Sequence, residues 1–209
     1  MKSPYPNRLW LMVNDSPLKS GFAFLPFSGG IILAAGLASS LLPRTGPKPL
    51  MLIGLAMATA GLFYLTQLGK DSSWVSHVLP AEVVMSIGLA LVFVPLSSLA
   101  LFGVEPRDAG VASALLNTTQ QVGGSLGTAL LNTLYASAVT SYLTTHVPGS
   151  AGKAAFQFEA YLHGYRIAFV VGGFLLLAAL IAVGIAVNAK RDQLPKVDEV
   201  EAEPVPAGV

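Results

Sequence analysis

Cysteine is absent from this 209-residue chain, and charged residues make up only 11% of it. Without cysteine the protein can form no disulfide, and it offers no thiolate for a metal site or for nucleophilic catalysis. The three histidines, His77, His146 and His163, lie in or beside polar connections rather than in a metal-binding pattern. We therefore expect no metal and no other cofactor. The formal net charge of +1 also argues against nucleic acid as a partner.

Apolar residues dominate instead, since 53% of the chain is hydrophobic and the mean hydropathy is +0.65. Both values exceed those of soluble globular proteins, and about 20 apolar residues suffice to cross roughly 30 Å of hydrocarbon. Apolar runs of this kind occupy residues 21–42, 50–68, 79–102, 111–141 and 165–188. Lipid forces backbone amides to pair within each segment, and the runs are too long for barrel strands. The sequence predicts an all-α, polytopic membrane helix bundle of about five transmembrane helices over residues 21–188.

The two ends of the chain differ from this bundle. Residues 1–20 lack the continuous apolar core of a secretory signal, so we interpret them as a polar lead that is non-native or the remnant of a preceding helix. Residues 189–209 combine five acidic residues with three prolines. That composition predicts a disordered, solvated tail.

Basic residues indicate the orientation in the membrane, because cytoplasmic loops are enriched in Lys and Arg. One side would hold Arg44, Lys48, Arg107, Lys190, Arg191 and Lys196, and the other Lys2, Arg8, Lys19, Lys70, Lys153 and Arg166. The numbers tie, but the first set is concentrated in two short loops and a helix exit. We therefore place the first set, and with it the C-terminus, in the cytoplasm.

The fourth run, residues 111–141, carries amide side chains inside an apolar stretch. At 100° per residue one arc of about 80° collects Asn117, Gln121, Gly124, Thr128, Asn132 and Tyr135, while leucines and valines face the opposite way. An unpaired amide in hydrocarbon costs several kcal/mol, so this face should meet water or a ligand. The candidate substrate-binding residues are Asn117, Gln120, Gln121, Thr128 and Asn132.

Helix packing is an alternative interpretation of the same face, because amides and hydroxyls also bond neighbouring membrane helices. Gly123 and Gly127 form a small-xxx-small pair that predicts a close helix contact. Glu82 is the one acid inside any of the five runs, and an intramembrane carboxylate is a candidate for proton coupling. Its place in the first helical turn favours a simpler interpretation, in which it complements the helix dipole at the wet interface.

Four segments, "SPLKSGFAFLP", "LASSLLPRTGPKPLMLIGL", "GLALVFVPL" and "GVASALLNTTQQVGGSLGTALL", resemble the C-terminal half of major facilitator superfamily transporters. The resemblance covers about residues 16–188 and is strongest to the fourteen-helix drug:proton antiporter group. The superfamily's cytoplasmic loop pattern is matched by Leu41, Arg44, Gly46 and Lys48, which implies a loop or gating role for the last three. Ser39 and Pro43 replace a glycine and an aspartate of that pattern, so the loop's charge network is incomplete.

This resemblance implies a portion of a multi-pass, proton-coupled exporter of small amphipathic organic compounds in the inner (plasma) membrane. Rocking transport needs two facing repeats, and this chain holds less than one. We therefore expect a fragment, with the missing N-terminal half as a possible separate partner chain. The alternative is a non-transporting membrane binding or assembly protein, whose polar stripe packs on partner helices. An enzyme is not expected, since no cluster of catalytic residues is found.

Overall fold

The computed structural model describes residues 21–69, 72, 74–147 and 152–187, and every regular element within them is helical. The predictions for residues 1–20 and for the 189–209 tail therefore lie outside the described residues. The helices are α3 (Leu25–Thr45), α4 (Pro47–Leu65), α5 (Leu79–Leu101), α6 (Ala109–Thr145) and α7 (Lys153–Ala186). A short π-helical turn, η1 (Trp74–Val78), precedes α5. Each of the five predicted runs corresponds to one long helix, which confirms the all-α class.

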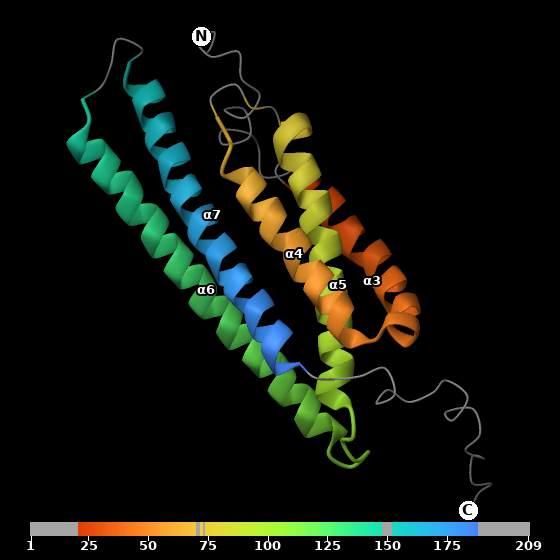
Figure 1. Cartoon of the computed structure of the whole chain (residues 1–209). Coiled ribbons are helices and arrows are strands. Elements are labelled where there is room, and N and C mark those ends of the chain that lie inside the picture. The colour runs from red at the N-terminus through yellow and green to blue at the C-terminus, as the bar shows by residue number, and fades with distance from the viewer. Residues whose placement is uncertain (1–20, 70–71, 73, 148–151, 188–209) are drawn as a thin grey trace, which may run out of the picture.

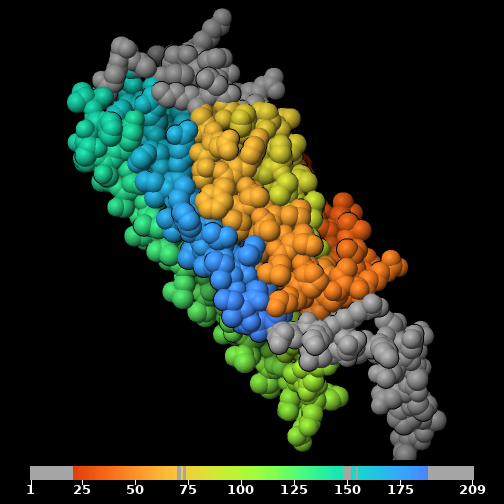
Figure 2. Space-filling view, viewed as in Figure 1, coloured from red at the N-terminus to blue at the C-terminus, as the bar shows by residue number. Residues whose placement is uncertain are grey.

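Successive helices run antiparallel and form one bundle (Figure 1). The main contacts join α3 to α5, α5 to α4, α4 to α7, and α7 to α6. Figure 2 shows α7 filling the surface between α4 and α6. Helix α6 therefore lies at one side of the bundle, with α7 as its main neighbour.

Proline marks where three of these helices begin. Pro26, Pro47 and Pro80 lie at the first or second position of α3, α4 and α5. At these positions the missing N–H is harmless and the fixed φ suits the helix. The sequence itself therefore sets these starting points.

Four helical segments among the described residues are long and apolar enough to cross a membrane: Gly21–Thr45, Pro47–Leu65, Trp74–Leu101 and Ala155–Ala186. Helix α6 is long enough, with 37 residues. Its amides and hydroxyls lower its hydropathy, so it does not join this group. Its assignment as a fifth span stays a prediction.

Small residues allow α4 and α5 to approach closely. A Cβ built on Gly54 would lie 2.5 Å from the carbonyl oxygen of Gly88, and one built on Gly88 would lie 2.6 Å from that of Gly54. Gly30 of α3 likewise leaves no room for a Cβ against the side chain of Ser86, which is fully buried. These glycines replace side-chain contact with backbone contact, the usual way for membrane helices to pack tightly.

Two connections differ from expectation. The break expected over residues 43–49 is confined to Gly46, because α3 continues through Pro43 to Thr45 and α4 starts at Pro47. Gly46 takes φ 80° and ψ 169°, a conformation essentially restricted to glycine. The gap that the sequence leaves between the runs 111–141 and 165–188 is largely helical, since α6 continues to Thr145 and α7 already begins at Lys153. Hydropathy locates only the apolar part of a helix, and α7 extends well into polar sequence.

Candidate functional site

Helix α6 carries the predicted substrate-binding residues on a surface that this chain leaves open. Asn117, Gln121, Thr128 and Asn132 are exposed, and Gln120 at the edge of the arc is half-buried. On the opposite face Leu115 and Leu126 are each 67% exposed. The helix thus has one amide face and one apolar face, and neither is covered along the N-terminal part of α6.

The amide face lies on the same side of α6 as the residues that pack on α7. Tyr135 contacts Tyr165 with ring centroids 4.6 Å apart, and Leu131 lies against Gly172. Two turns before Leu131, a Cβ on Gly124 would meet no atom of the described residues within 4 Å. The amide face is therefore open beside the α6–α7 contact.

Several hydroxyl groups on α6 donate to carbonyls of the same helix. Thr118 donates to the carbonyl of Ala114 and Thr119 to that of Leu115, both at 2.8 Å. Thr133 does the same to Ala129 at 2.7 Å. The exposed amides of Asn117, Gln121 and Asn132 can offer hydrogen bonds to a ligand or to another helix.

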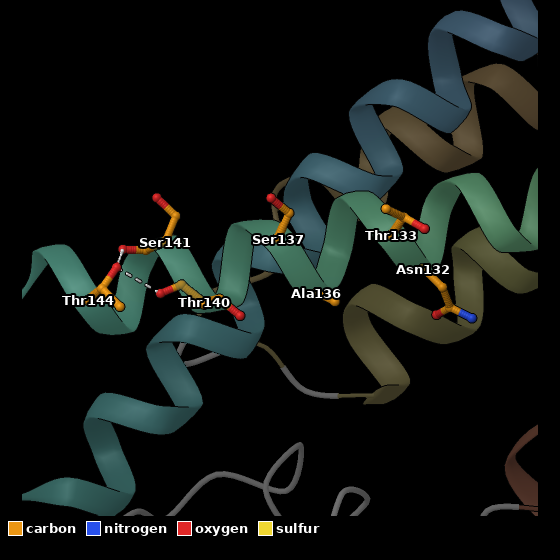
Figure 3. Close-up of a pocket in the computed structure, with 7 residues that line it drawn as sticks. All are labelled: Asn132, Thr133, Ala136, Ser137, Thr140, Ser141 and Thr144. Atoms are coloured by element: carbon orange, nitrogen blue, oxygen red, sulfur yellow. Dashed lines mark hydrogen bonds between the residues drawn. The ribbon is translucent and has the colours of Figure 1, made fainter.

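A second polar surface follows Asn132 along the C-terminal part of α6. It is a shallow, open groove lined by Asn132, Thr133, Ala136, Ser137, Thr140, Ser141 and Thr144. All seven side chains come from one helix, and Thr144 donates to the carbonyls of Thr140 and Ser141 (Figure 3). Asn132 belongs to both surfaces, while the rest of this hydroxyl groove lies on the side of α6 away from Tyr135.

The predicted packing pair finds no partner in the described part of the chain. A Cβ on Gly123 or Gly127 would meet no atom within 4 Å. The contact predicted for them would therefore involve residues outside this part of the chain, and it stays a prediction. Sequence reasoning missed the pair in actual contact, Gly54 with Gly88, although Gly54 and Ala58 carry the same small-xxx-small spacing.

The loop residues assigned a gating role lie at the α3–α4 turn. Arg44 is exposed near the end of α3, and Lys48 is half-buried at the start of α4. Gly46 between them is buried, and its N–H donates to the carbonyl of Leu42 at 3.0 Å. This geometry explains the glycine, while the gating role stays a prediction.

Glu82 lies in the first turn of α5, as the helix-dipole interpretation requires. It is not at a wet surface, however, because only 8% of it is exposed. Its Oε2 has no hydrogen-bond partner among the described residues. The expectation of a carboxyl at the wet interface was wrong, because the fold buries this turn: the adjacent Ala81 packs in a buried cluster with Leu65 and Leu68.

Two polar contacts of α7 were not foreseen. The Arg166 guanidinium donates to the carbonyl of Leu68 from Nε at 3.0 Å and from Nη2 at 2.7 Å, so it joins α7 to the end of α4. The Tyr142 hydroxyl donates to Glu159 at 3.1 Å and joins α6 to α7. A single charge at the start of the apolar run 165–188 was the signal for Arg166, but its acceptor is a backbone carbonyl that no pattern marks.

Comparison with known proteins places this helix set in a family. A sequence profile described as Major Facilitator Superfamily matches residues 10–128, more than half of the chain. The chain belongs to this superfamily. Its apolar helices and this membership make it a membrane protein.

Relatives within the superfamily are named for drug resistance or export. The puromycin resistance protein pur8 of Streptomyces alboniger is 41% identical over 174 residues, which are 81% of this chain and 34% of the relative. The cephamycin export protein CmcT of Amycolatopsis lactamdurans is 35% identical, with 88% of this chain and 35% of the relative covered. The multidrug resistance protein B homolog of Mycobacterium tuberculosis (strain H37Rv) is 28% identical, with 84% and 37% covered. The chain thus spans about a third of the length of these relatives.

Proposed function

We propose that this chain forms part of a secondary transporter that exports small amphipathic organic molecules across the plasma membrane. Asn117, Gln120, Gln121, Thr128 and Asn132 of α6 would form one wall of the substrate path. The names of the relatives, which mention puromycin, cephamycin and multidrug resistance, support this class of substrate.

The observation that carries the proposal is the open amide face of α6. Asn117, Gln121 and Asn132 are exposed, while Leu115 and Leu126 on the other face suit lipid. In hydrocarbon such amides would cost several kcal/mol each, so a wet path or a ligand accounts for them. Uncharged groups that both donate and accept also suit chemically varied substrates.

The proposal also includes the orientation of the helices in the membrane and the coupling of transport. We place the α3–α4 and α5–α6 turns, with Arg44, Lys48 and Arg107, in the cytoplasm, because short basic loops face that side. The C-terminus would then be cytoplasmic as well. On the basis of the superfamily resemblance, we also propose that transport is coupled to protons. A second set of helices would act as the partner that completes the substrate path.

The test replaces amides in a complete transporter that contains this helix set. We expect Gln121→Ala and Asn132→Ala to change the resistance conferred against individual compounds by roughly 2- to 10-fold, the effect of one lost hydrogen bond of about 0.5–1.5 kcal/mol. The matched control is Thr119→Val, since the Thr119 hydroxyl donates to the Leu115 carbonyl of its own helix. Resistance is measured against a panel of compounds at equal amounts of protein in the membrane.

A non-transporting role in assembly makes the opposite prediction for the same variants. If the amide face packs on a partner helix, the alanine variants lower the amount of assembled protein and change resistance to every compound in parallel. Such a parallel loss would refute the proposed path. A changed order of compounds at constant protein level would support it.

A further inference from the structure

Helices α6 and α7 are too long for the membrane that their neighbours cross. With 37 and 34 residues, at about 1.5 Å per residue, they measure roughly 55 and 51 Å. Transmembrane helices tilt by up to about 40°, which still leaves about 42 and 39 Å along the membrane normal. Hydrocarbon is about 30 Å thick. Tilt alone therefore does not accommodate these two helices.

The composition of α7 shows which end of the helix extends beyond the hydrocarbon. Residues 167–186 are continuously apolar, and 20 residues match the hydrocarbon thickness. Before them come Lys153, Glu159, His163 and Arg166 within 14 residues. A carboxylate and a lysine are costly at membrane depth. The excess thus lies at the N-terminal end of α7, which pairs with the C-terminal end of α6.

The packing of α7 changes at the same level. Between Arg166 and Gly184, α7 packs along α4. Arg166 donates to the carbonyl of Leu68, and a Cβ built on Gly184 would lie 3.8 Å from Cδ2 of Leu52. Ahead of Arg166 it contacts α6, as in Gly164 against Val139 and Tyr135. The two helices thus continue as a pair where the flank of α4 ends.

Aromatic residues mark an interface at this level. The rings of Tyr135 and Tyr165 are in contact between α6 and α7. Tyr64, at the end of α4, stacks on His77 of η1, the element that begins at Trp74. Tyr and Trp concentrate where hydrocarbon meets the polar headgroups. These residues and Arg166 place the membrane boundary near Tyr135 on α6.

The outer face of α6 changes character at that boundary. On the side away from α7, Leu115, Val122, Leu126 and Leu130 are all exposed, as a lipid-facing surface would be. From Thr133 to Thr144 the same side becomes the hydroxyl groove of Figure 3. An apolar surface that turns into hydroxyls without changing direction indicates a passage from lipid to water.

From these observations we infer that residues 136–147 and 152–165 form a solvated arm, a helical pair that stands about 15 Å or more outside the membrane. Tyr142 holds the arm together, because its hydroxyl donates to Glu159 and its ring lies 5.3 Å from His163 and 5.8 Å from Phe156. The hydroxyl groove is the water-facing surface of this arm, and Asn132 marks the end of the membrane-embedded amide face. This inference concerns topology and does not depend on the proposed transport.

The absence of cysteine permits a direct test by single-cysteine labelling. Ser137→Cys and Ser141→Cys report on the arm, and Leu126→Cys and Leu130→Cys are matched controls on the same side of the same helix. A charged, membrane-impermeant maleimide is added to right-side-out and, separately, to inverted vesicles that contain the protein. Labelling after denaturation in detergent gives the total for each variant.

We expect both serine positions to label about tenfold faster than both leucine positions, and from one side of the membrane only, because hydrocarbon excludes the charged reagent. Equal, slow labelling of all four positions in both kinds of vesicle, with full labelling after denaturation, would overturn the arm. Fast labelling of Leu126→Cys would overturn it too, since the boundary would then lie elsewhere.

Discussion

The contact between Gly54 of α4 and Gly88 of α5 gives the sharpest stability prediction. In Gly54→Ala the new Cβ would lie 2.5 Å from the carbonyl oxygen of Gly88, 2.9 Å from the Cβ of Leu91 and 3.0 Å from Cγ2 of Val92. The nearest of these atoms belongs to backbone, so no rotamer change relieves the clash. The two helices must move apart instead.

The size of the effect follows from two opposing terms. Overpacking of a close contact costs about 1–3 kcal/mol, while alanine gains up to about 1 kcal/mol over glycine in a helix interior. We expect Gly54→Ala to lower the free energy of unfolding by about 1–2 kcal/mol. Gly88→Ala should behave alike, since its Cβ would lie 2.6 Å from the Gly54 carbonyl oxygen.

The assay is unfolding in mixed micelles with increasing dodecyl sulfate, followed by the helical circular dichroism signal. Gly36→Ala is the matched control, because a Cβ at this position in α3 meets nothing within 4 Å. It should be neutral or stabilising. The double variant Gly54→Ala/Gly88→Ala should lose less than the sum of the single losses, because one separation of the helices relieves both clashes.

A Gly54→Ala variant as stable as Gly36→Ala would refute the reasoning. So would strict additivity in the double variant. Either result would mean that the backbones of α4 and α5 do not meet at these glycines.

Three further changes test other parts of the fold by the same unfolding assay. Gly46→Ala should destabilise by about 1–3 kcal/mol, because φ 80° with ψ 169° is strained for any residue with a Cβ, and a neutral result would contradict that backbone conformation. Arg166→Met removes both hydrogen bonds to Leu68 and should lower the free energy of unfolding by about 1–2 kcal/mol, and Arg166→Lys should lower it less. Equal stability of both variants and the unchanged protein would show that this contact contributes nothing. Glu82→Gln should be tolerated or stabilising, because a buried carboxylate without a partner at Oε2 is more costly than an amide. Glu105→Gln, at a well-exposed side chain, is the matched neutral control. A strong loss of stability with Glu82→Gln alone would show that the carboxylate has a partner.

The helices themselves could be predicted from the sequence because their cause is local. Runs such as residues 79–102 are apolar over a membrane-spanning length, and Pro80 marks the helix start, so α5 was expected nearly residue by residue. The amide arc on α6 is local too, since helical periodicity alone places Asn117 and Gln121 on one side. Hydropathy failed at α7, because Lys153, Glu159 and His163 interrupt the apolar pattern of residues 153–164, although the helix already begins at Lys153.

The sequence by itself determined an apolar, all-helical chain with one amide-bearing helix and glycines able to allow close packing. Only the tertiary structure decided which glycines do so: Gly54 meets Gly88, while Gly123 and Gly127 meet no other helix among the described residues. It also decided that Glu82 is buried and that Arg166 reaches the Leu68 carbonyl. The physical reason is that periodicity defines the faces of one helix, whereas the element that covers a face depends on where distant segments of the chain pack.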